Sequence, residues 1–477
     1  MTGGAEVVSK PYVLYGHQTW RWYGKYLRDP ISCFLEAREI YGPVGGLGNP
    51  LPFLKDGRQH VMAFGAVPNR IVFGQPDLFR PGGQVLRGPR ESAQRRMRRS
   101  IFAMHGAEHD RHRRIMQPPL SRLAVASYAP AIAGLIDQVL DRWEVGKPID
   151  AYHEMLTLSN WIAAHLLFGE ADFERSLAIC MLIRDWITLD VDVRTLHLRP
   201  TVPGTRVRRL LRHAEKLEAA MRQLIEEKRS AGAPGNDLLS QLIRAHGDKD
   251  FAMSDDELVA HSAILHGASF LTTASTLAWA MYLLAQNPSV AAELDREVAS
   301  KLTSWPPATG EIEAMPLLDA VLKETLRLLP PVHHTFRTVA APTDALGLPL
   351  QRDDRVIMSA FMTHREPSVY PDPDVFDPSR WARSKPGPYD YIPFSAGPRL
   401  CLGFAFATLE MKMILARIVQ RYRLALVPGS KIDVIYRLTL CPSAGVPMTV
   451  EPRDGAYSTA PVSGNILKLV RHGRPGL

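Results

Sequence analysis

The order of apolar and polar positions along the chain predicts a mainly helical protein with a smaller β part. Residues 206–229 repeat apolar positions at helical spacing, with charged residues between them, which is typical of an amphipathic helix. Residues 59–78 carry β-type runs interrupted by Pro and Gly, so we expect a small sheet early in the chain. After residue 330, strand-like segments such as 356–362 alternate with Pro-rich irregular chain, and a helix returns at 404–422.

One helix is predicted to be unusually long and buried. Ser254 followed by Glu257 forms a capping box, the pattern that begins a helix, and an apolar run follows it as far as Asn287 and Pro288. At 1.5 Å per residue this helix spans about 50 Å. A helix that is apolar on all sides over such a length is expected to pass through the core.

The domain organisation is expected to be simple. No internal repeat recurs at a fixed period. The last strands should reach about residue 453, so residues 1–453 are predicted to form a single catalytic domain. Residues 454–477 are predicted to form a loosely held C-terminal tail.

Composition narrows the class of protein. The chain has 477 residues, 46% of them apolar and 22% charged, which is ordinary for a globular protein. No run approaches the roughly 20 apolar residues of a membrane helix, and residues 1–30 lack the order of a signal peptide. We therefore expect a cytoplasmic protein without a membrane anchor. The four cysteines are widely spaced, which indicates neither a disulfide framework nor a zinc site.

Part of the net charge of +8 is concentrated between residues 87 and 114, where nine arginines accompany three acids. One interpretation is a solvated loop followed by a basic helix. The other is a docking surface for an anionic partner or ligand. Nucleic acid is not expected, because aromatic residues do not alternate with the arginines as a stacking surface requires. The arginines are Arg87, Arg90, Arg95, Arg96, Arg98, Arg99, Arg111, Arg113 and Arg114.

The strongest candidate for chemistry is Cys401, in the segment 393–405. It follows a turn-prone loop and precedes a predicted helix, whose free N–H groups stabilise a thiolate. Gly403 has no side chain, so a flat ligand could approach closely, and Arg399 is suited to pairing with a carboxylate. Considered alone, a single cysteine of this kind is more often a buried structural residue.

The spacing of the whole segment favours the functional interpretation. Phe394, Gly397, Arg399, Cys401 and Gly403 are spaced as in the haem-binding loop of cytochromes P-450, which the segment resembles. The resemblance implies the cytochrome P-450 fold, with the long central helix over the haem. It also implies haem b (iron protoporphyrin IX) as cofactor, with Cys401 as the axial iron ligand and Phe394, Arg399 and Gly403 among the haem-binding residues. A thiolate ligand favours O–O cleavage by electron donation.

Further residues match the family in the same order along the chain. The family pairs a Glu-x-x-Arg motif with a later Arg, so the resemblance implies a buried structural triad of Glu324, Arg327 and Arg380 that fixes the loop carrying Cys401. His109 and Arg113, four residues apart on one predicted helical face, could hold a haem propionate. The resemblance also assigns Arg337 and Arg399 to the propionates.

The centre of the long helix departs from the family pattern. The family carries Ala/Gly-Gly-x-Asp/Glu-Thr there, whereas this chain has Ser269 in place of the Gly and Leu271 in place of the acid. Thr272 matches the hydroxyl on the oxygen side. Leucine transfers no proton, so an ordered water chain, a polar group on the substrate or Ser269 must serve instead. The expected catalytic residues are therefore Thr272 and Ser269.

The resemblance covers residues 40–453 and implies a monooxygenase, an oxidoreductase acting on paired donors. It would insert one atom of O2 into a small organic substrate, by hydroxylation or epoxidation. Phe270 and Leu271 indicate an apolar pocket wall and hence a hydrophobic substrate. Electrons would come from a ferredoxin and its reductase, because the chain has no flavin- or nicotinamide-binding segment. We expect a monomer that binds no nucleic acid.

Two alternatives stay open at this stage. One is peroxide-driven oxygenation, or rearrangement of an oxygenated substrate, on the same fold. The other is a non-catalytic haem-binding sensor.

Overall fold

The computed structural model describes residues 12–13, 17–48, 58–82, 88–170, 172–190, 204–233, 235, 237–246, 253–308, 310–436 and 439–471. The chain divides into two compact units. Unit 1 comprises residues 1–84, 333–373 and 386–400, and unit 2 comprises residues 85–332, 374–385 and 401–477.

Unit 1 is built on a six-stranded mixed sheet of order β1-β2-β3-β7-β6-β4. Two strands distant in sequence, β3 (His60–Ala63) and β7 (Arg355–Met358), pair in parallel, whereas β6 (Thr335–Val339) and β4 (Phe79–Gly82) complete an antiparallel edge. The other elements are β1 (Tyr12–Val13), β2 (Val44–Gly48), α1 (His17–Arg28), α2 (Pro30–Tyr41), α3 (Ala66–Gly74), α16 (Ala360–Thr363) and the 3-10 turn η2 (Gly397–Arg399).

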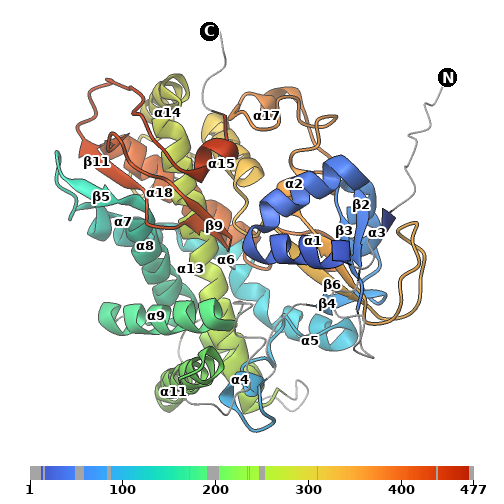
Figure 1. The fold of residues 1–477 in the computed structure, drawn as a ribbon. Coiled ribbons are helices and arrows are strands. Elements are labelled where there is room, and N and C mark those ends of the chain that lie inside the picture. The colour runs from blue at the N-terminus through green and yellow to red at the C-terminus, as the bar shows by residue number, and fades with distance from the viewer. Residues whose placement is uncertain are drawn as a thin grey trace. The chain divides into compact units, whose positions relative to one another are not determined.

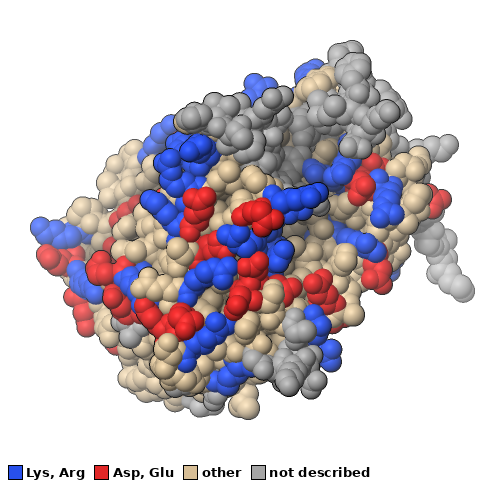
Figure 2. Space-filling model, turned by 90° about the horizontal axis from the view of Figure 1, so that it is seen from below, with Lys and Arg blue, Asp and Glu red and all other residues tan. Residues whose placement is uncertain are grey.

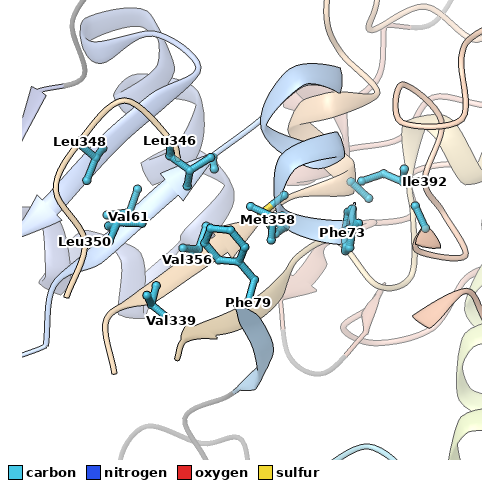
Figure 3. Close-up of a cluster of buried hydrophobic side chains, with 14 residues drawn as sticks. Val61, Phe73, Phe79, Val339, Leu346, Leu348, Leu350, Val356, Met358 and Ile392 are labelled. Atoms are coloured by element: carbon cyan, nitrogen blue, oxygen red, sulfur yellow. The ribbon is translucent and has the colours of Figure 1, made fainter. Parts of the chain in front are cut away.

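The core of unit 1 is a cluster of buried apolar side chains from the sheet, α3 and two loops (Figure 3). Val356 and Met358 of β7 meet Phe79 and Phe73 there. Successive strand residues face opposite sides of a sheet, so positions 356 and 358 share the face that carries this cluster.

The predicted early sheet is present only in part. Residues 60–63 and 79–82 are strands, but Ala66–Gly74 between them is the helix α3. The β-branched residues of this segment are typical of strands, which is why the sequence indicated one. However, Pro68 lies in the first helical turn, where its missing N–H costs nothing, and Val72 and Phe73 gain burial in the core.

Unit 2 is mainly helical, and α13 (Asp255–Ala285) runs through it with α8 (Ala151–Phe168) alongside (Figure 1). Its helices before α13 are α4 (Ala93–Arg96), α5 (Gly106–Met116), α6 (Arg122–Ser127), α7 (Ala129–Leu140), α9 (Phe173–Asp190), α11 (Arg206–Ser230) and α12 (Leu238–His246). Those after it are α14 (Pro288–Lys301), α15 (Pro316–Leu328), α17 (Arg380–Arg383) and α18 (Phe404–Arg421). The 3-10 turns are η1 (Pro118–Leu120) and η3 (Asn465–Lys468).

Two small antiparallel sheets complete unit 2. One has the order β5 (Pro148–Asp150), β11 (Pro447–Glu451), β8 (Arg423–Leu426), and the other pairs β9 (Val434–Tyr436) with β10 (Leu440–Pro442). Cys441 lies buried in β10. The mainly helical composition, the helix over 206–229 and the helix at 404–422 are all confirmed.

The start of α13 confirms the predicted capping box. Ser254 accepts the backbone N–H of Glu257, and the Glu257 carboxylate accepts the backbone N–H of Ser254 at 2.7 Å. By length and composition alone, α13 contains a window that is apolar enough to cross a membrane. That window is 83% buried inside the protein, as expected of a core helix.

Residues 454–471 belong to unit 2 and pack against the rest of it, so they are not the loosely held tail that we expected. The N–H of Gly429 donates to the carbonyl of Pro461 at 2.8 Å, and Ile466 is fully buried. These contacts had no signature in the sequence, because the segment has no regular period. Residues 472–477 lie outside the described residues.

Candidate functional site

Cys401 lies three residues before the first residue of α18, beside the N-cap Gly403. It is exposed, whereas Cys33, Cys180 and Cys441 are buried. The surrounding protein raises the pKa of the Cys401 thiol, while a hydrogen bond from the Gly403 N–H and the charge of Arg113 oppose that rise. Cys401 is thus solvent-accessible, and the Gly403 N–H and the charge of Arg113 favour its thiolate.

Two glycines shape the segment around Cys401. Gly397 has φ +66°, and a Cβ there would lie 2.7 Å from the carbonyl oxygen of Phe73, so no larger residue fits. At Gly403, by contrast, no atom lies within 4 Å of where a Cβ would be. The side of the chain at Gly403 is thus open, which agrees with the close approach predicted for a flat ligand.

In unit 1, two of the predicted cofactor-binding arginines lie near each other. Arg337 is buried, and burial together with the charge of Arg399 lowers its pKa to about 10. Its guanidinium also lies over the ring of Phe73, 5.1 Å from the centroid. Two neighbouring cations repel each other, so an anionic group between them would be stabilised. Phe394 lies in the turn that leads to Arg399.

In unit 2, α5 carries the other predicted pair. His109 is almost fully buried, and its Nδ1 lies 3.0 Å from a carboxylate oxygen of Asp110. Arg113, one turn further along, is close enough to lower the pKa of Cys401 through its charge. The structure therefore brings Arg113, which is on the same helix as His109, near Cys401.

A pair of histidines that sequence reasoning missed connects α5 to α13. The backbone N–H of Ile101 donates to Nδ1 of His261 at 3.1 Å, and Nε2 of His261 lies 3.0 Å from Nδ1 of His112. Because Nδ1 of His261 is an acceptor, its Nε2 carries the proton and donates to His112. Burial lowers the pKa of His261 to about 3 and also lowers the pKa of His112. Both rings are therefore neutral near pH 7.

The middle of α13 presents an accessible stripe on an otherwise buried helix. Ala268 is exposed and Thr272 is half-buried, whereas the flanking residues Phe270, Leu271 and Thr273 are buried. The members of the stripe are Ile264, Leu265, Ala268, Ser269 and Thr272.

The hydroxyls on this stripe are bonded to the helix itself. Ser269 Oγ donates to the carbonyl of His266 at 2.6 Å, and Thr272 Oγ1 donates to the carbonyl of Ala268 at 3.1 Å. Ser269 therefore has its proton bonded to the helix backbone and does not donate it to Thr272 in this arrangement. Leu271 is 6% exposed and contributes mainly to packing.

The buried ionic triad is confirmed. Glu324 accepts from Arg327 Nε and from Arg380 Nε, both at 2.9 Å, and both charged partners are buried. It also accepts the backbone N–H of Asp377 and the indole N–H of Trp381, each at 3.0 Å. A buried carboxylate with this many donors is fully satisfied. That the triad fixes the loop carrying Cys401 stays a prediction.

Three arginines of the arginine-rich segment pair with carboxylates of other helices, so the segment is neither fully solvated nor a purely positive patch. Arg96 makes a bidentate pair with Glu218 of α11 at 2.7 and 2.6 Å, and Arg98 pairs with Asp190 of α9. Arg99 contacts Asp256 at the start of α13, at 3.2 Å. Figure 2 shows basic and acidic side chains intermingled over the described part of this face. Arg87 lies outside the described residues.

The residues present fit a haem. In unit 2, Cys401 is exposed and the chain at Gly403 leaves room beside it. In unit 1, Arg337 and Arg399 are neighbouring cations that suit an anionic group. A single thiolate with cationic side chains for carboxylates is the donor set that a thiolate-ligated haem requires.

Comparison with known proteins agrees with this site. A family model described as cytochrome P450 matches residues 85–449. The putative cytochrome P450 139 of Mycobacterium bovis is 31% identical over 386 residues, covering 78% of this chain and 86% of the relative. The cyclooctat-9-en-7-ol 5-monooxygenase of Streptomyces melanosporofaciens is 30% identical over 403 residues, covering 81% and 87%.

The fold is shared with a solved structure. Retinoic acid-bound cyanobacterial CYP120A1 matches with a TM-score of 0.80 over 93% of this chain and 99% of that chain, at 23% sequence identity. The chain belongs to the cytochrome P450 family, and it is therefore a monooxygenase of the oxidoreductase class with haem as its cofactor.

Proposed function

We propose that Cys401 is the axial iron ligand of haem b and that the enzyme inserts one atom of O2 into a hydrophobic organic substrate. The observation that carries this proposal is the exposure of Cys401 just before α18, in a chain whose other three cysteines are buried. When bound, the haem supplies the oxygen chemistry. His109, Arg113, Arg337 and Arg399 would hold its propionates, with Phe394 and Gly403 beside the ring.

The protein's own part is to exclude water, place the substrate and supply protons. The stripe on α13 is apolar at Ile264, Leu265 and Ala268, which favours an apolar substrate skeleton. Thr272 would present its hydroxyl on the oxygen side, with Ser269 beside it. Of the relatives, one is named for oxidising a cyclic alcohol and one binds retinoic acid. We propose a related class of hydrophobic substrate and a role in secondary metabolism.

The partners follow from the family chemistry. We propose a ferredoxin and a ferredoxin reductase as electron donors, a monomeric state and a cytoplasmic location.

The test of the metal ligand is Cys401→Ser, with Cys441→Ser as the matched control. The reduced, carbon monoxide-treated parent should show the long-wavelength absorption band typical of thiolate-ligated haem, and Cys441→Ser should keep it. Cys401→Ser should lose the band. Survival of the band in Cys401→Ser would show that another residue binds the iron.

One observation favours the alternative of peroxide-driven oxygenation. Leu271, at the position where the family carries an acid, transfers no proton, which favours an oxidant that brings its own protons, such as hydrogen peroxide. Product formed from peroxide alone, at a rate comparable to that with NADPH and surrogate redox partners, would support this route. A sensor without catalysis predicts product from neither.

A further inference from the structure

The accessible stripe on α13 lies between two buried side chains that make hydrogen bonds to other segments. On the N-terminal side, His261 lies beneath the loop at Ile101, whose N–H it accepts. On the C-terminal side, the indole N–H of Trp279 donates to the carbonyl of Leu440 at 2.9 Å. Both ring systems are fully buried.

Between His261 and Trp279, the stripe extends from Ile264 to Thr272. Positions 264 and 272 are separated by eight residues, which corresponds to about 12 Å along the helix axis. Three of the five positions are aliphatic, and the two polar ones are Ser269 and Thr272. A substrate lying along the stripe would therefore meet a mainly apolar surface with polar atoms at one end.

The two hydroxyl oxygens of the stripe are available as hydrogen-bond acceptors only. A hydroxyl has one proton to donate and two lone pairs. The protons of Ser269 and Thr272 are both bonded to carbonyls of α13, so the two oxygens face the accessible side with lone pairs alone. At these two positions α13 offers hydrogen-bond acceptors and no donor.

We infer that Ser269 selects substrates in which an apolar skeleton carries a hydroxyl group, whose proton is donated to Ser269 Oγ. This inference names the substrate class of the proposed function and rests on it. A ketone, ether or ester brings only acceptors and would face the Ser269 oxygen unfavourably. A protonated amine brings donors, but the stripe has no carboxylate to offset the cost of removing its charge from water.

A substrate hydroxyl bound at Ser269 would also supply the proton-bearing group that the missing acid would otherwise provide. Positions 269 and 272 are neighbours on one helical face, so a hydroxyl held at Ser269 places a proton-bearing group beside Thr272. Leu271 provides none there. The substrate would then contribute one of the three proton sources that the sequence left open.

The test uses the haem-loaded enzyme and three matched cyclic probes, cyclododecanol, cyclododecanone and cyclododecane. Dissociation constants are measured by isothermal titration calorimetry. In the parent, the alcohol should bind about tenfold more tightly than the ketone, the ratio that one net hydrogen bond of ordinary strength provides. Ser269→Ala should remove this preference, and Ser269→Thr should keep it.

Ser262→Ala is the matched control. Ser262 lies on the same helix and donates to the carbonyl of Leu258 at 2.8 Å, but it is fully buried and lies outside the stripe. This variant should keep the alcohol preference, which separates a local role of Ser269 from a general effect of removing a hydroxyl from α13.

Several results would overturn the inference. They are equal affinities for alcohol and ketone in the parent, a preference that survives Ser269→Ala, and no binding of any of the three probes. The proposed function is tested separately, by the absorption band of the carbon monoxide adduct and by the product formed with NADPH. An enzyme that oxidises the probes without preferring the alcohol would keep its proposed function and lose this inference.

Discussion

Leu271 is a single residue whose replacement tests how protons reach the site. It is buried beside Thr272 on α13. Leu271→Asp introduces a carboxyl whose pKa burial should raise, so that it carries a proton near neutral pH. We expect the product formed per NADPH consumed to rise by about twofold or more, because general acids in reach of a reacting group accelerate proton transfer.

Leu271→Asn is the control for that experiment, since it has the shape of aspartate and no ionisable group. It should leave coupling close to the parent value. Efficient coupling in the parent, unchanged by Leu271→Asp, would show that another relay already serves the site and that Leu271 acts only as a wall.

At the scale of elements, the short helix α4 is held by two buried carboxylates, Glu218 and Asp190. Arg96 of α4 and Arg222 of α11 both donate to Glu218, and Gln94 of α4 donates to Asp190 of α9 at 2.7 Å. Hydrogen bonds from charged groups contribute about 1.5–3 kcal/mol each. These contacts anchor an otherwise very short helix to α9 and α11.

Glu218→Gln should therefore loosen α4. We expect amide hydrogen exchange of residues 93–96 to accelerate by about 10- to 100-fold, the factor that corresponds to about 1.4–2.7 kcal/mol. Glu226→Gln on the same helix removes a more exposed carboxylate that pairs with Arg229 at 3.6 Å, and it should change exchange little. Equal exchange in parent and Glu218→Gln would mean that packing alone holds α4.

How far the sequence predicts the molecule depends on how local each feature is. The segment around Cys401, the capping box at Ser254 and the Glu324–Arg327 pair are short patterns, so their geometry follows from neighbouring residues. His112 and His261 are 149 residues apart, and each is an ordinary residue of its own helix. Only tertiary packing brings them together. The acidic partners of Arg96, Arg98 and Arg99 could not be predicted for the same reason, since they lie on α9, α11 and α13.

At the scale of the whole molecule, buried neutral histidines set the response to acid. The pKa of His261 is lowered to about 3 and that of His266 to about 4, in both cases mainly by burial. Below about pH 6.5 the unfolded chain takes up protons at these rings and the folded chain does not. The free energy of unfolding should therefore fall as the pH is lowered from 6.5 toward 4, by up to about 1.4 kcal/mol per pH unit for each ring.

Chemical unfolding at several pH values tests this. His261→Gln should make the decline between pH 6.5 and 4 shallower by about 1.4 kcal/mol per pH unit. His153→Gln, which replaces an exposed ring on α8, should leave it unchanged. Parallel curves for the parent and His261→Gln would contradict a neutral, buried His261.

The hydroxyl-bearing residues of α13 have a mechanical consequence. Side chains that donate to the carbonyl one turn back tend to curve a helix. Five of them follow one another here, Ser269, Thr272, Thr273, Ser275 and Thr276. These residues lie between the capping box at Ser254 and the buried Trp279. We therefore expect the axis of α13 to be curved over residues 269–276 rather than straight.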